Sequence, residues 1–486
     1  MDATTMPDAT PPLPALPPGL LTALTAVLGP KGVVTDAADL AAWTTDWRGL
    51  YQGATPCLLR PASTSEVSAT VRLLAQAGVP MVPQGGNTSM VGGAAPDESG
   101  RQVILSLTRM NRIRDVDTLD MTMTAEAGVI LKSAQEAAAA AGALFPLSLG
   151  AEGSATIGGV LSTNAGGNTT VRYGNARELM LGLEVVLPDG QVFSGLRRLR
   201  KDNTGYALKH LFVGAEGSLG LITAATLRLY PPARATAVAL CAVASEDAAL
   251  ALFRRFRDRD ETAIRAFEYM SGIGMGMVRR HIEGATVPVE GEHDHYCLVD
   301  LASSRADADL HGLMESVLED AMAAEEVLDA ALARSDAQAA AIWRLREEHP
   351  EAQKRAGASV KSDVSVPVSR TPELIRRASA ALRKLIPGSR PVPFGHMGDG
   401  NIHMNLAQPE DMSAAEFLAR GHDIMDTVNE VVRDLDGSFS AEHGIGRLKT
   451  DMMESWRGGA ELEAMRRIKS AFDPQGLMNP GKVLPS

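Results

Sequence analysis

Two histidines flank a glycine-rich turn in the segment FGHMGDGNIHMN, residues 394–405. The imidazoles could bind a metal ion, the glycines could form a phosphate-binding loop, or the segment could be only a turn between two strands. Apolar and polar residues alternate after the turn, which is typical of a strand with one buried face. This alternation places His403 and Asn405 on the polar face, and the turn can fold His396 back beside His403. Asp399 within the turn is most simply a turn former.

Two imidazoles leave a metal site incomplete, because catalytic zinc commonly takes three protein ligands and keeps one position open. The segment SAEHGIG, residues 440–446, can supply a third ligand through the carboxylate of Glu442. Zinc is the default for this donor set, although manganese, cobalt or iron would also accept it. The next residue, His443, has an imidazole whose usual pKa of about 6.5 suits a general base. Taken singly, a histidine in a strand is more often an ordinary hydrogen-bonded residue.

Three glycine-rich loops lie nearer the N-terminus. Such loops expose backbone N–H groups, and glycine allows positive φ and close approach, so they can cradle a pyrophosphate. Any one alone is more often a turn, and the absence of GxGxxG spacing argues against a Rossmann fold. The loops contain Pro83, Gly85, Gly86, Asn87, Thr88 and Ser89 in the first, Gly153, Ser154, Thr156, Gly158, Gly159, Asn164, Gly166 and Gly167 in the second, and Glu216, Gly217 and Ile222 in the third.

The elements around these loops alternate between short strands and helices, which indicates an α+β or α/β domain. Hydrophobic periodicity predicts helices from Leu20, over residues 64–78 and over residues 131–143, and strands over residues 79–84 and 103–108. After about residue 233 the chain changes to long helices rich in Ala, Arg and Glu, separated by strands such as HYCLVDLA. A domain boundary is expected there.

Composition excludes several classes of protein. The 486 residues suggest more than one domain, and a net charge of −12 opposes non-specific binding to nucleic acid or anionic membranes. The three cysteines, Cys57, Cys241 and Cys297, form no CxxC, so neither a disulfide framework nor an iron–sulfur cluster is expected, and a cytoplasmic location fits. The N-terminal residues lack the features of a secretory signal, and no apolar run is long enough for a membrane span.

Together the three loops resemble the FAD-binding domain of the vanillyl-alcohol oxidase-type flavoproteins, also called FAD-linked oxidases, across residues 50–232. The resemblance implies two α+β subdomains that hold FAD between them, with the first loop at the pyrophosphate. The second loop and Ile222 would flank the flavin and its ribityl chain, and Glu216, Gly217 and Asn479 would also contact the cofactor. Some members attach FAD through a histidine near the first loop, which has none here, so non-covalent FAD is implied.

The segments HMGDGNIHMN, SAEHGIGRLK and FDPQGLMNPGK resemble the C-terminal α+β substrate domain of FAD-dependent D-2-hydroxyacid dehydrogenases, across about residues 236–486. That family includes D-lactate dehydrogenase, the flavin subunit of glycolate oxidase and D-2-hydroxyglutarate dehydrogenase. The resemblance is the main support for His396, His403 and Glu442 as joint metal ligands. It implies that a substrate hydride passes to the flavin while His443 contacts the substrate and takes its hydroxyl proton.

The choice among hydroxy acids depends on the segment from Arg346 to Lys361, whose cations could grip substrate carboxylates. Without the family they would be ordinary helix and strand-edge charges. Lys361 before SDVSVP and Asn405 after His403 resemble the D-2-hydroxyglutarate branch. That branch places a hydroxyl-bearing substrate contact four residues after the arginine, where this chain has Pro350. D-2-hydroxyglutarate is therefore the best prediction, with D-lactate or a D-malate-like acid behind it.

We predict four segments along the chain: a disordered leader (1–19), an FAD-binding domain with N-terminal helices (20–232), a substrate-binding domain (233–436) and a C-terminal segment that completes the active site (437–486). The electron acceptor would be a partner such as electron-transfer flavoprotein or a quinone, and a homodimer is an open alternative. Two other functions also stay open: the flavin subunit of a membrane-associated complex with an iron–sulfur partner, and a non-catalytic flavin- or metal-binding sensor.

Overall fold

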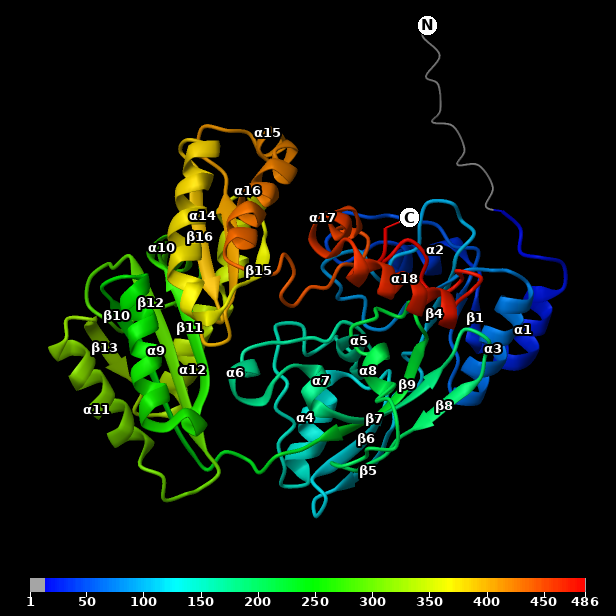
Figure 1. Ribbon diagram of the computed structural model, residues 1–486, viewed down its shortest axis with the longest axis horizontal. Coiled ribbons are helices and arrows are strands. Elements are labelled where there is room, and N and C mark those ends of the chain that lie inside the picture. Colours follow the sequence, from blue (N-terminus) through cyan, green and yellow to red (C-terminus); the bar gives the residue numbers. More distant parts are fainter. Residues whose placement is uncertain (1–13, 486) are drawn as a thin grey trace, which may run out of the picture.

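The computed structural model describes residues 14–485, whose strands form three sheets (Figure 1). Most of the predicted leader, residues 1–13, lies outside the described residues. In Figure 1 the sheet of the central part of the chain occupies the left half, and the two N-terminal sheets occupy the right half. No helix among residues 14–485 has both the length and the apolar character needed to cross a membrane.

The first sheet carries the first glycine-rich loop at the end of its edge strand. It has the order β1-β2-β4-β3, in which β2, β4 and β3 are parallel and β1 is antiparallel to β2. Ser63 caps α3 through its hydroxyl, which accepts the N–H of Glu66 at 3.2 Å. The predicted helices and strands are confirmed here as α1 (Leu20–Leu28), α3 (Thr64–Gln76), β3 (Met81–Gln84) and β4 (Val103–Ser106). The structure adds β1 (Val33–Val34), β2 (Leu58–Leu59) and α2 (Ala37–Thr44).

The second sheet is antiparallel and carries the other two loops. Its order is β5-β6-β9-β7-β8. The predicted helix over residues 131–143 is confirmed as α4, whereas the short helix α5 inside the second loop was not predicted. Thr156 caps α5 by accepting the N–H of Gly159 at 3.3 Å. The elements are β5 (Ile113–Asp117), β6 (Thr122–Glu126), β7 (Met180–Val186), β8 (Val192–Gly195), β9 (Leu221–Arg228), α4 (Leu131–Ala140), α5 (Ile157–Ser162), α6 (Thr170–Tyr173), α7 (Ala176–Leu179) and α8 (Lys209–Phe212).

The third sheet is covered by helices on both faces. Its order is β13-β10-β12-β11-β16-β17-β14, and β15 also pairs with β17. Both faces of β10 are buried, since alternate residues pack into two different hydrophobic clusters, which explains its unbroken apolar sequence. The strands are β10 (Ala235–Val243), β11 (Ile264–Ser271), β12 (His295–Ser303), β13 (Val327–Leu332), β14 (Ser359–Val360), β15 (Asp363–Ser365), β16 (Arg390–Gly395) and β17 (Asn401–Ala407).

Helices pack against both faces of this sheet. One face packs against α9 (Glu246–Asp260), α11 (Leu310–Ala323), α14 (Thr371–Leu385) and α16 (Gly421–Asp434), and the short α15 (Ala414–Ala419) precedes α16. The opposite face packs against α10 (Gly272–His281), α12 (Asp336–Glu347) and α13 (His349–Arg355).

The predicted turn and strand of the histidine segment are confirmed. Ile402, Met404 and Leu406 in β17 are fully buried in the core on one face, as the alternation predicted. Gly400 ends the turn with φ of +90°, and a Cβ at this position would lie 2.2 Å from the carbonyl oxygen of Val366. Glycine is therefore required there by both conformation and packing.

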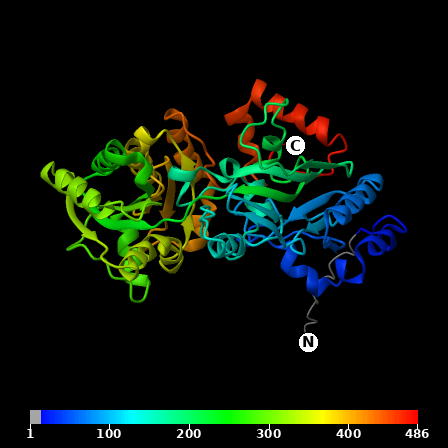
Figure 2. The same cartoon turned by 90° about the horizontal axis from the view of Figure 1, so that it is seen from below.

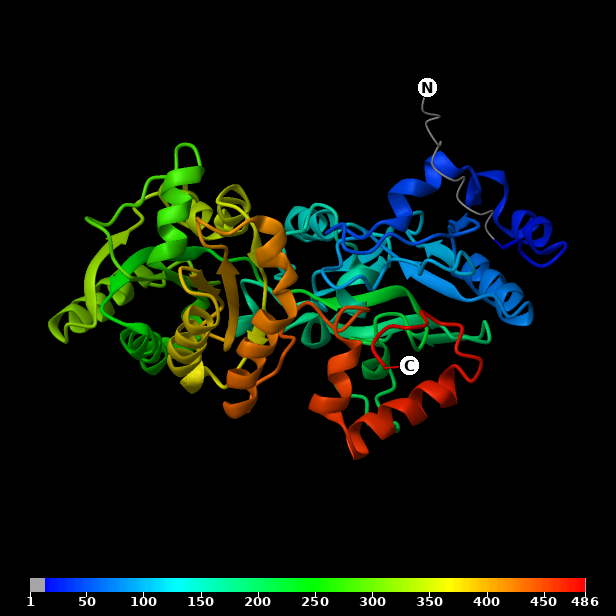
Figure 3. The ribbon, with the colours of Figure 1, turned by 90° about the horizontal axis from the view of Figure 1, so that it is seen from above.

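The C-terminal segment returns from the third sheet to the N-terminal half. Figures 2 and 3 show its red helices α17 (Met453–Arg457) and α18 (Ala460–Phe472) beside the teal-to-green strands of the N-terminal half. Phe472 packs edge-on against Phe212 with ring centroids 5.6 Å apart, and Met478 forms a parallel bridge with Met81. The stretch between α16 and α17 must therefore cross from one half of the molecule to the other.

Two of the cysteines, although far apart in the sequence, are brought together by the third sheet. Cys241 of β10 and Cys297 of β12 are directly opposite in the strand register and are free thiols. Burial raises the pKa of Cys241 to about 12 and that of Cys297 well above its usual value. Protonated thiols of this kind are poor nucleophiles, so the pair is chemically quiet.

Candidate active site

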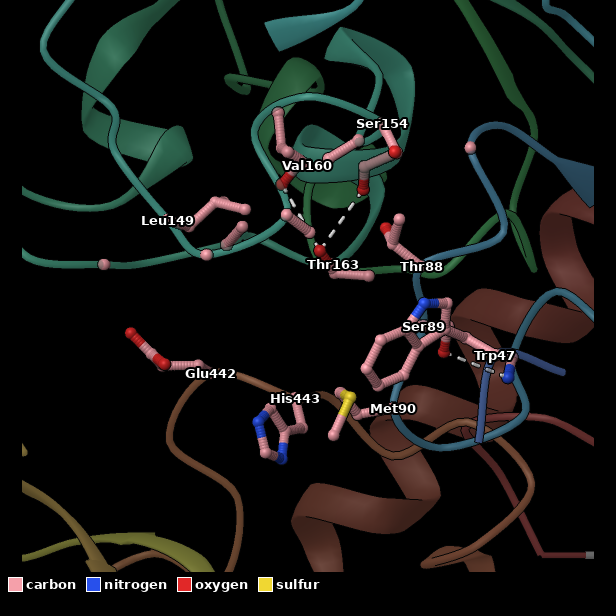
Figure 4. Close-up of a pocket in the computed structure, with 18 of the residues that line it drawn as sticks. Trp47, Thr88, Ser89, Met90, Leu149, Ser154, Val160, Thr163, Glu442 and His443 are labelled. Atoms are coloured by element: carbon pink, nitrogen blue, oxygen red, sulfur yellow. Dashed lines mark hydrogen bonds between the residues drawn. The ribbon is translucent and has the colours of Figure 1, made fainter. Parts of the chain in front are cut away.

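A cavity of about 1340 Å³ lies between the glycine-rich loops and the third sheet. Figure 4 shows Glu442 and His443 on one side of it, facing Leu149 and Thr163 on the other. Its volume exceeds that of a typical small-molecule pocket, so it can hold a large cofactor together with a small substrate. The predicted site residues that line it are Pro83, Gly85, Gly86, Asn87, Thr88, Ser89, Ser154, Thr156, Gly158, Gly159, Gly166, Gly167, Glu216, Gly217, Ile222, Arg346, Lys361, His396, His403, Asn405, Glu442 and His443.

Three of the predicted cofactor residues are not on the cavity wall. Asn479 lies behind the loops, where its side-chain amide donates to the carbonyl oxygens of Gly93 at 3.0 Å and Glu216 at 2.7 Å. The side-chain oxygen of Asn164 accepts the N–H of Arg177 at 3.0 Å. Gly153 occupies a turn where an added Cβ would meet no atom within 4 Å. The two asparagines hold the loops in place, and no contact in the structure explains the glycine.

The three loops interlock through their glycines. A Cβ on Gly86 would lie 1.9 Å from the carbonyl oxygen of Ser154, and one on Gly85 would lie 2.4 Å from the hydroxyl of Thr156. Gly217 in the third loop, with φ of +72°, packs its α-carbon against Pro83 of the first in the same way. The glycines are therefore needed for contact between loops, beyond the cofactor approach that the sequence suggested.

Replacing Gly86 by alanine should lower FAD occupancy and reduce the free energy of unfolding by about 1–3 kcal/mol, because the new methyl group forces the first two loops apart. Flavin absorbance per chain and thermal unfolding would measure both effects. Gly153→Ala is the matched control in the second loop, and it should leave both quantities unchanged. Equal FAD occupancy in the two variants would contradict the interlocking role.

The predicted metal ligands come together at one end of the cavity. His396 follows β16, His403 lies in β17, and Glu442 lies in the crossing stretch between α16 and α17. One potential ligand atom from each residue lies within 4.8 Å of the others. The Nε2 atom of His396 is 3.6 Å from a carboxylate oxygen of Glu442. Two imidazoles and one carboxylate fit the donor set of a catalytic divalent metal site.

Burial and mutual charge shift the pKa values of these ligands. Burial alone would lower the pKa of His396, but the carboxylates of Glu268 and Glu442 raise it to about 9. Burial raises the pKa of Glu442 to about 7 and lowers that of His403 to about 3. Such opposite shifts within one cavity are typical of functional sites.

Asp363 in β15 was overlooked in the sequence, although it lies between two of the histidines. Its carboxylate accepts the backbone N–H groups of Glu442 and His443, both at 2.9 Å. It is also 3.5 Å from Nδ1 of His443 and 3.6 Å from Nδ1 of His403. Burial opposes its ionisation, but interaction with the neighbouring His443, His403 and Lys449 side chains holds its pKa well below the usual range. A carboxylate in the short β-like segment SDVSVP, directly after Lys361, was the signal that could have identified it.

Burial lowers the pKa of His443, so its imidazole is neutral near pH 7. With Nδ1 directed at Asp363, the other ring nitrogen of His443 remains available to take a proton. This is the arrangement of a general base oriented by a carboxylate.

Several cations line the cavity near the histidines. The guanidinium of Arg346 lies over the ring of Phe394, with its central carbon 4.9 Å from the centroid. Burial lowers the pKa of Lys361, and the nearby charges of Arg48 and Lys354 lower it further. Arg48, which the sequence reasoning missed, is itself a lining residue. The cavity can therefore bind more than one carboxylate.

Two predicted contact residues already have partners within the chain. The amide of Asn405 donates to the side-chain oxygen of Gln353 at 3.0 Å. Glu216 accepts the backbone N–H groups of Ile445 at 2.7 Å and Gly446 at 2.8 Å, so its carboxylate ties the third loop to the crossing stretch. The observed contacts of the Glu216 carboxylate are thus structural, and because the residue also lines the cavity its contact with the cofactor stays a prediction.

Comparisons with known proteins agree with this layout. Residues 232–483 match the family described as FAD linked oxidases, C-terminal domain, and residues 55–195 match the FAD binding domain. The chain is 37% identical over 92% of its length to a D-2-hydroxyglutarate dehydrogenase of Xanthomonas citri pv. viticola, of which it covers 93%. It is also 37% identical over 93% of its length to a mitochondrial protein of Schizosaccharomyces pombe named for D-lactate dehydrogenase, of which it covers 86%.

Among solved structures, p-cresol methylhydroxylase with bound substrate superposes with a TM-score of 0.75 at 17% identity, and the match covers 95% of this chain and 96% of that one. A likeness at this level of identity concerns the fold alone. It agrees with the predicted vanillyl-alcohol oxidase-type architecture.

Proposed function

The chain belongs to the FAD-linked oxidases, and from this premise we propose that it oxidises a D-2-hydroxy acid to the 2-oxo acid, with D-2-hydroxyglutarate as the best candidate. One observation carries the proposal: a single cavity is lined by the loops of the FAD-binding domain, by the cluster of two histidines and a glutamate, and by His443. A non-catalytic sensor would not need an oriented, neutral imidazole at this position.

The oxidation removes a hydride from C2 of the acid and a proton from its hydroxyl. Bound flavin supplies the hydride acceptor. His443 takes the proton at the ring nitrogen that does not face Asp363, and the negative charge of Asp363 stabilises the imidazolium that results. Arg346 and Lys361 bind carboxylate oxygens and so hold C2 against the flavin.

We further propose that His396, His403 and Glu442 hold a divalent metal ion, with zinc as the default. A metal there would act as a Lewis acid on the substrate hydroxyl and make its proton easier to remove. The support is the donor set and its closeness to His443, the next residue after Glu442.

The charges on the cavity wall favour a substrate with two carboxylates. Arg346 and Lys361 could each pair with one carboxylate, and Arg48 adds a third cation. Pro350 also lines the cavity and offers no hydroxyl. Without this hydroxyl, one contact to a distal carboxylate is missing. D-lactate, or another acid that does not need this contact, is therefore the second candidate.

Anaerobic mixing of the purified flavoprotein with separate D- and L-2-hydroxy acids tests the assignment. D-2-hydroxyglutarate should bleach the flavin fastest, D-lactate and D-malate more slowly, and the L-acids not at all. Bleaching by D-lactate alone would move the assignment to the second candidate. A flavin that no 2-hydroxy acid reduces would reject the proposed reaction.

Electrons must leave the reduced flavin for a partner, and we propose electron-transfer flavoprotein or a quinone. A glycolate oxidase-like complex with an iron–sulfur partner is the alternative. Reoxidation rates of the reduced enzyme with each acceptor would distinguish the two alternatives.

The three buried free thiols support a reducing compartment such as the cytoplasm. We also propose the division of the chain into the four segments predicted from the sequence, in which residues 437–486 complete the site.

A further inference from the structure

Glu268 is a carboxylate in the middle of an apolar strand. It lies in β11, between Phe267 and Tyr269, and its exposed fraction is 1%. An ionised carboxylate so deeply buried is costly unless it is paired and hydrogen-bonded. It does not line the cavity among the described residues, so any role at the site must be exerted through its partners.

Both oxygens of Glu268 are used, each by a different functional side chain. Nδ1 of His396 lies 2.7 Å from Oε1, and Nε of Arg346 donates to Oε2 at 2.6 Å. The three residues come from positions far apart in the sequence: β11, the end of β16 and helix α12. Pairing of β11 with β16 at Tyr269 and Gly395 brings the glutamate beside His396.

The contact with His396 determines which of its ring nitrogens faces the other metal ligands. Because Nδ1 donates its proton to Glu268, Nε2 is the ring nitrogen left to bind a metal ion once its own proton is released, and Nε2 is the atom that faces Glu442 at 3.6 Å. A carboxylate behind a metal-binding histidine fixes the tautomer and ring orientation and raises the basicity of the ligand.

The contact with Arg346 leaves the other end of the guanidinium for a ligand. Nε of Arg346 donates to Glu268, and the guanidinium group lies over the ring of Phe394. Within residues 14–485, Nη1 and Nη2 donate no hydrogen bond to the protein. They are the two donors that a carboxylate can accept side by side.

We propose that Glu268 is a positioning residue shared by the group of metal ligands and the substrate-carboxylate site. It sets the position of His396 relative to that of Arg346. The inference rests on the proposed function and deepens it. A substrate that binds the cluster through its hydroxyl and Arg346 through a carboxylate meets two groups whose separation is fixed by one buried carboxylate.

Glu268→Gln tests the proposal. The amide has the same size but only one acceptor oxygen, whereas His396 and Arg346 each donate to a separate oxygen of Glu268. Chelated protein would be titrated with zinc against a chromophoric chelator, which requires no substrate. Zinc affinity should fall by about 10–100-fold. After saturation with zinc, KM for the hydroxy acid should rise roughly tenfold. Unchanged zinc affinity or unchanged KM would overturn the shared role.

The matched control is Asp300→Asn in the neighbouring strand β12. Asp300 is likewise fully buried and accepts two hydrogen bonds from an arginine, Arg265, at 3.0 and 2.7 Å, but it does not line the cavity. It should lower stability without changing zinc affinity or KM. In addition, Arg346→Met should raise KM but leave zinc affinity unchanged, and adding it to Glu268→Gln should raise KM little further.

Glu268→Asp keeps the charge, so it provides a folded variant if Glu268→Gln does not fold. Its side chain is one methylene shorter and cannot keep both contacts, so it should weaken zinc binding or raise KM, and no change in either would also overturn the proposal. An unaltered protein that binds no divalent ion would reject the metal part of the proposed function together with this inference. Equal zinc binding by unaltered and variant proteins would reject this inference alone.

Discussion

His443→Asn should lower kcat by about 10²–10⁴-fold while the protein keeps its FAD and its metal ion. Asparagine preserves a donor that can face Asp363 and removes only the basic nitrogen. Steady-state kinetics with D-2-hydroxyglutarate measure the effect, and flavin absorbance and metal analysis on the same sample show that the site is otherwise intact.

His295→Asn is the control for this substitution. His295 also forms a side-chain hydrogen bond, between Nδ1 and the hydroxyl of Tyr269 at 2.7 Å, but it does not line the cavity. Its replacement should change kcat by less than about twofold, within the range of most substitutions away from a site. Full turnover by His443→Asn with FAD and metal bound would mean that another group or water removes the proton.

Local patterns were enough to predict how the histidine segment folds, although the family resemblance was the main support for its role as part of a metal site. Strict alternation in β17 identified its buried face, and the glycine turn explained how His396 comes back beside His403. The three loops were identified by their glycines alone. Each of these features is determined by residues close together in the sequence, so a local pattern is enough to predict it.

The groups that hold the site together depend on contacts between distant parts of the chain. Glu268 sits in an apolar strand, and its partners are 78 and 128 residues away, so nothing local distinguishes it from a strand-edge charge. The carboxylate of Glu216 and the amide of Asn479 bind backbone groups of loops that the fold brings next to them, and the sequence did not predict these contacts. Arg48 was missed because it precedes all the recognised motifs.

Removing the metal ion should lower kcat/KM by about 10³-fold, because Lewis-acid stabilisation of several kcal/mol corresponds to a loss of this size. Chelated protein should keep its FAD, because the glycine loops do not use the three metal ligands. Activity should return on adding zinc, and reduction of the flavin by substrate under anaerobic conditions should slow by the same factor.

Glu442→Gln provides the same test within the chain, since an amide is a much weaker ligand than a carboxylate. Asp399→Asn is the matched control: Asp399 lies close to the cluster in sequence, but its carboxylate accepts the backbone N–H of Asn401 at 3.1 Å, which an asparagine side chain can also accept. Metal content should fall in the first variant and persist in the second. A chelated protein with full activity would remove the metal from the reaction, and the two histidines would then serve only to bind the acid. In the case we expect, the loss on chelation and the loss in His443→Asn should not add, because the metal ion and the imidazole act on the same proton.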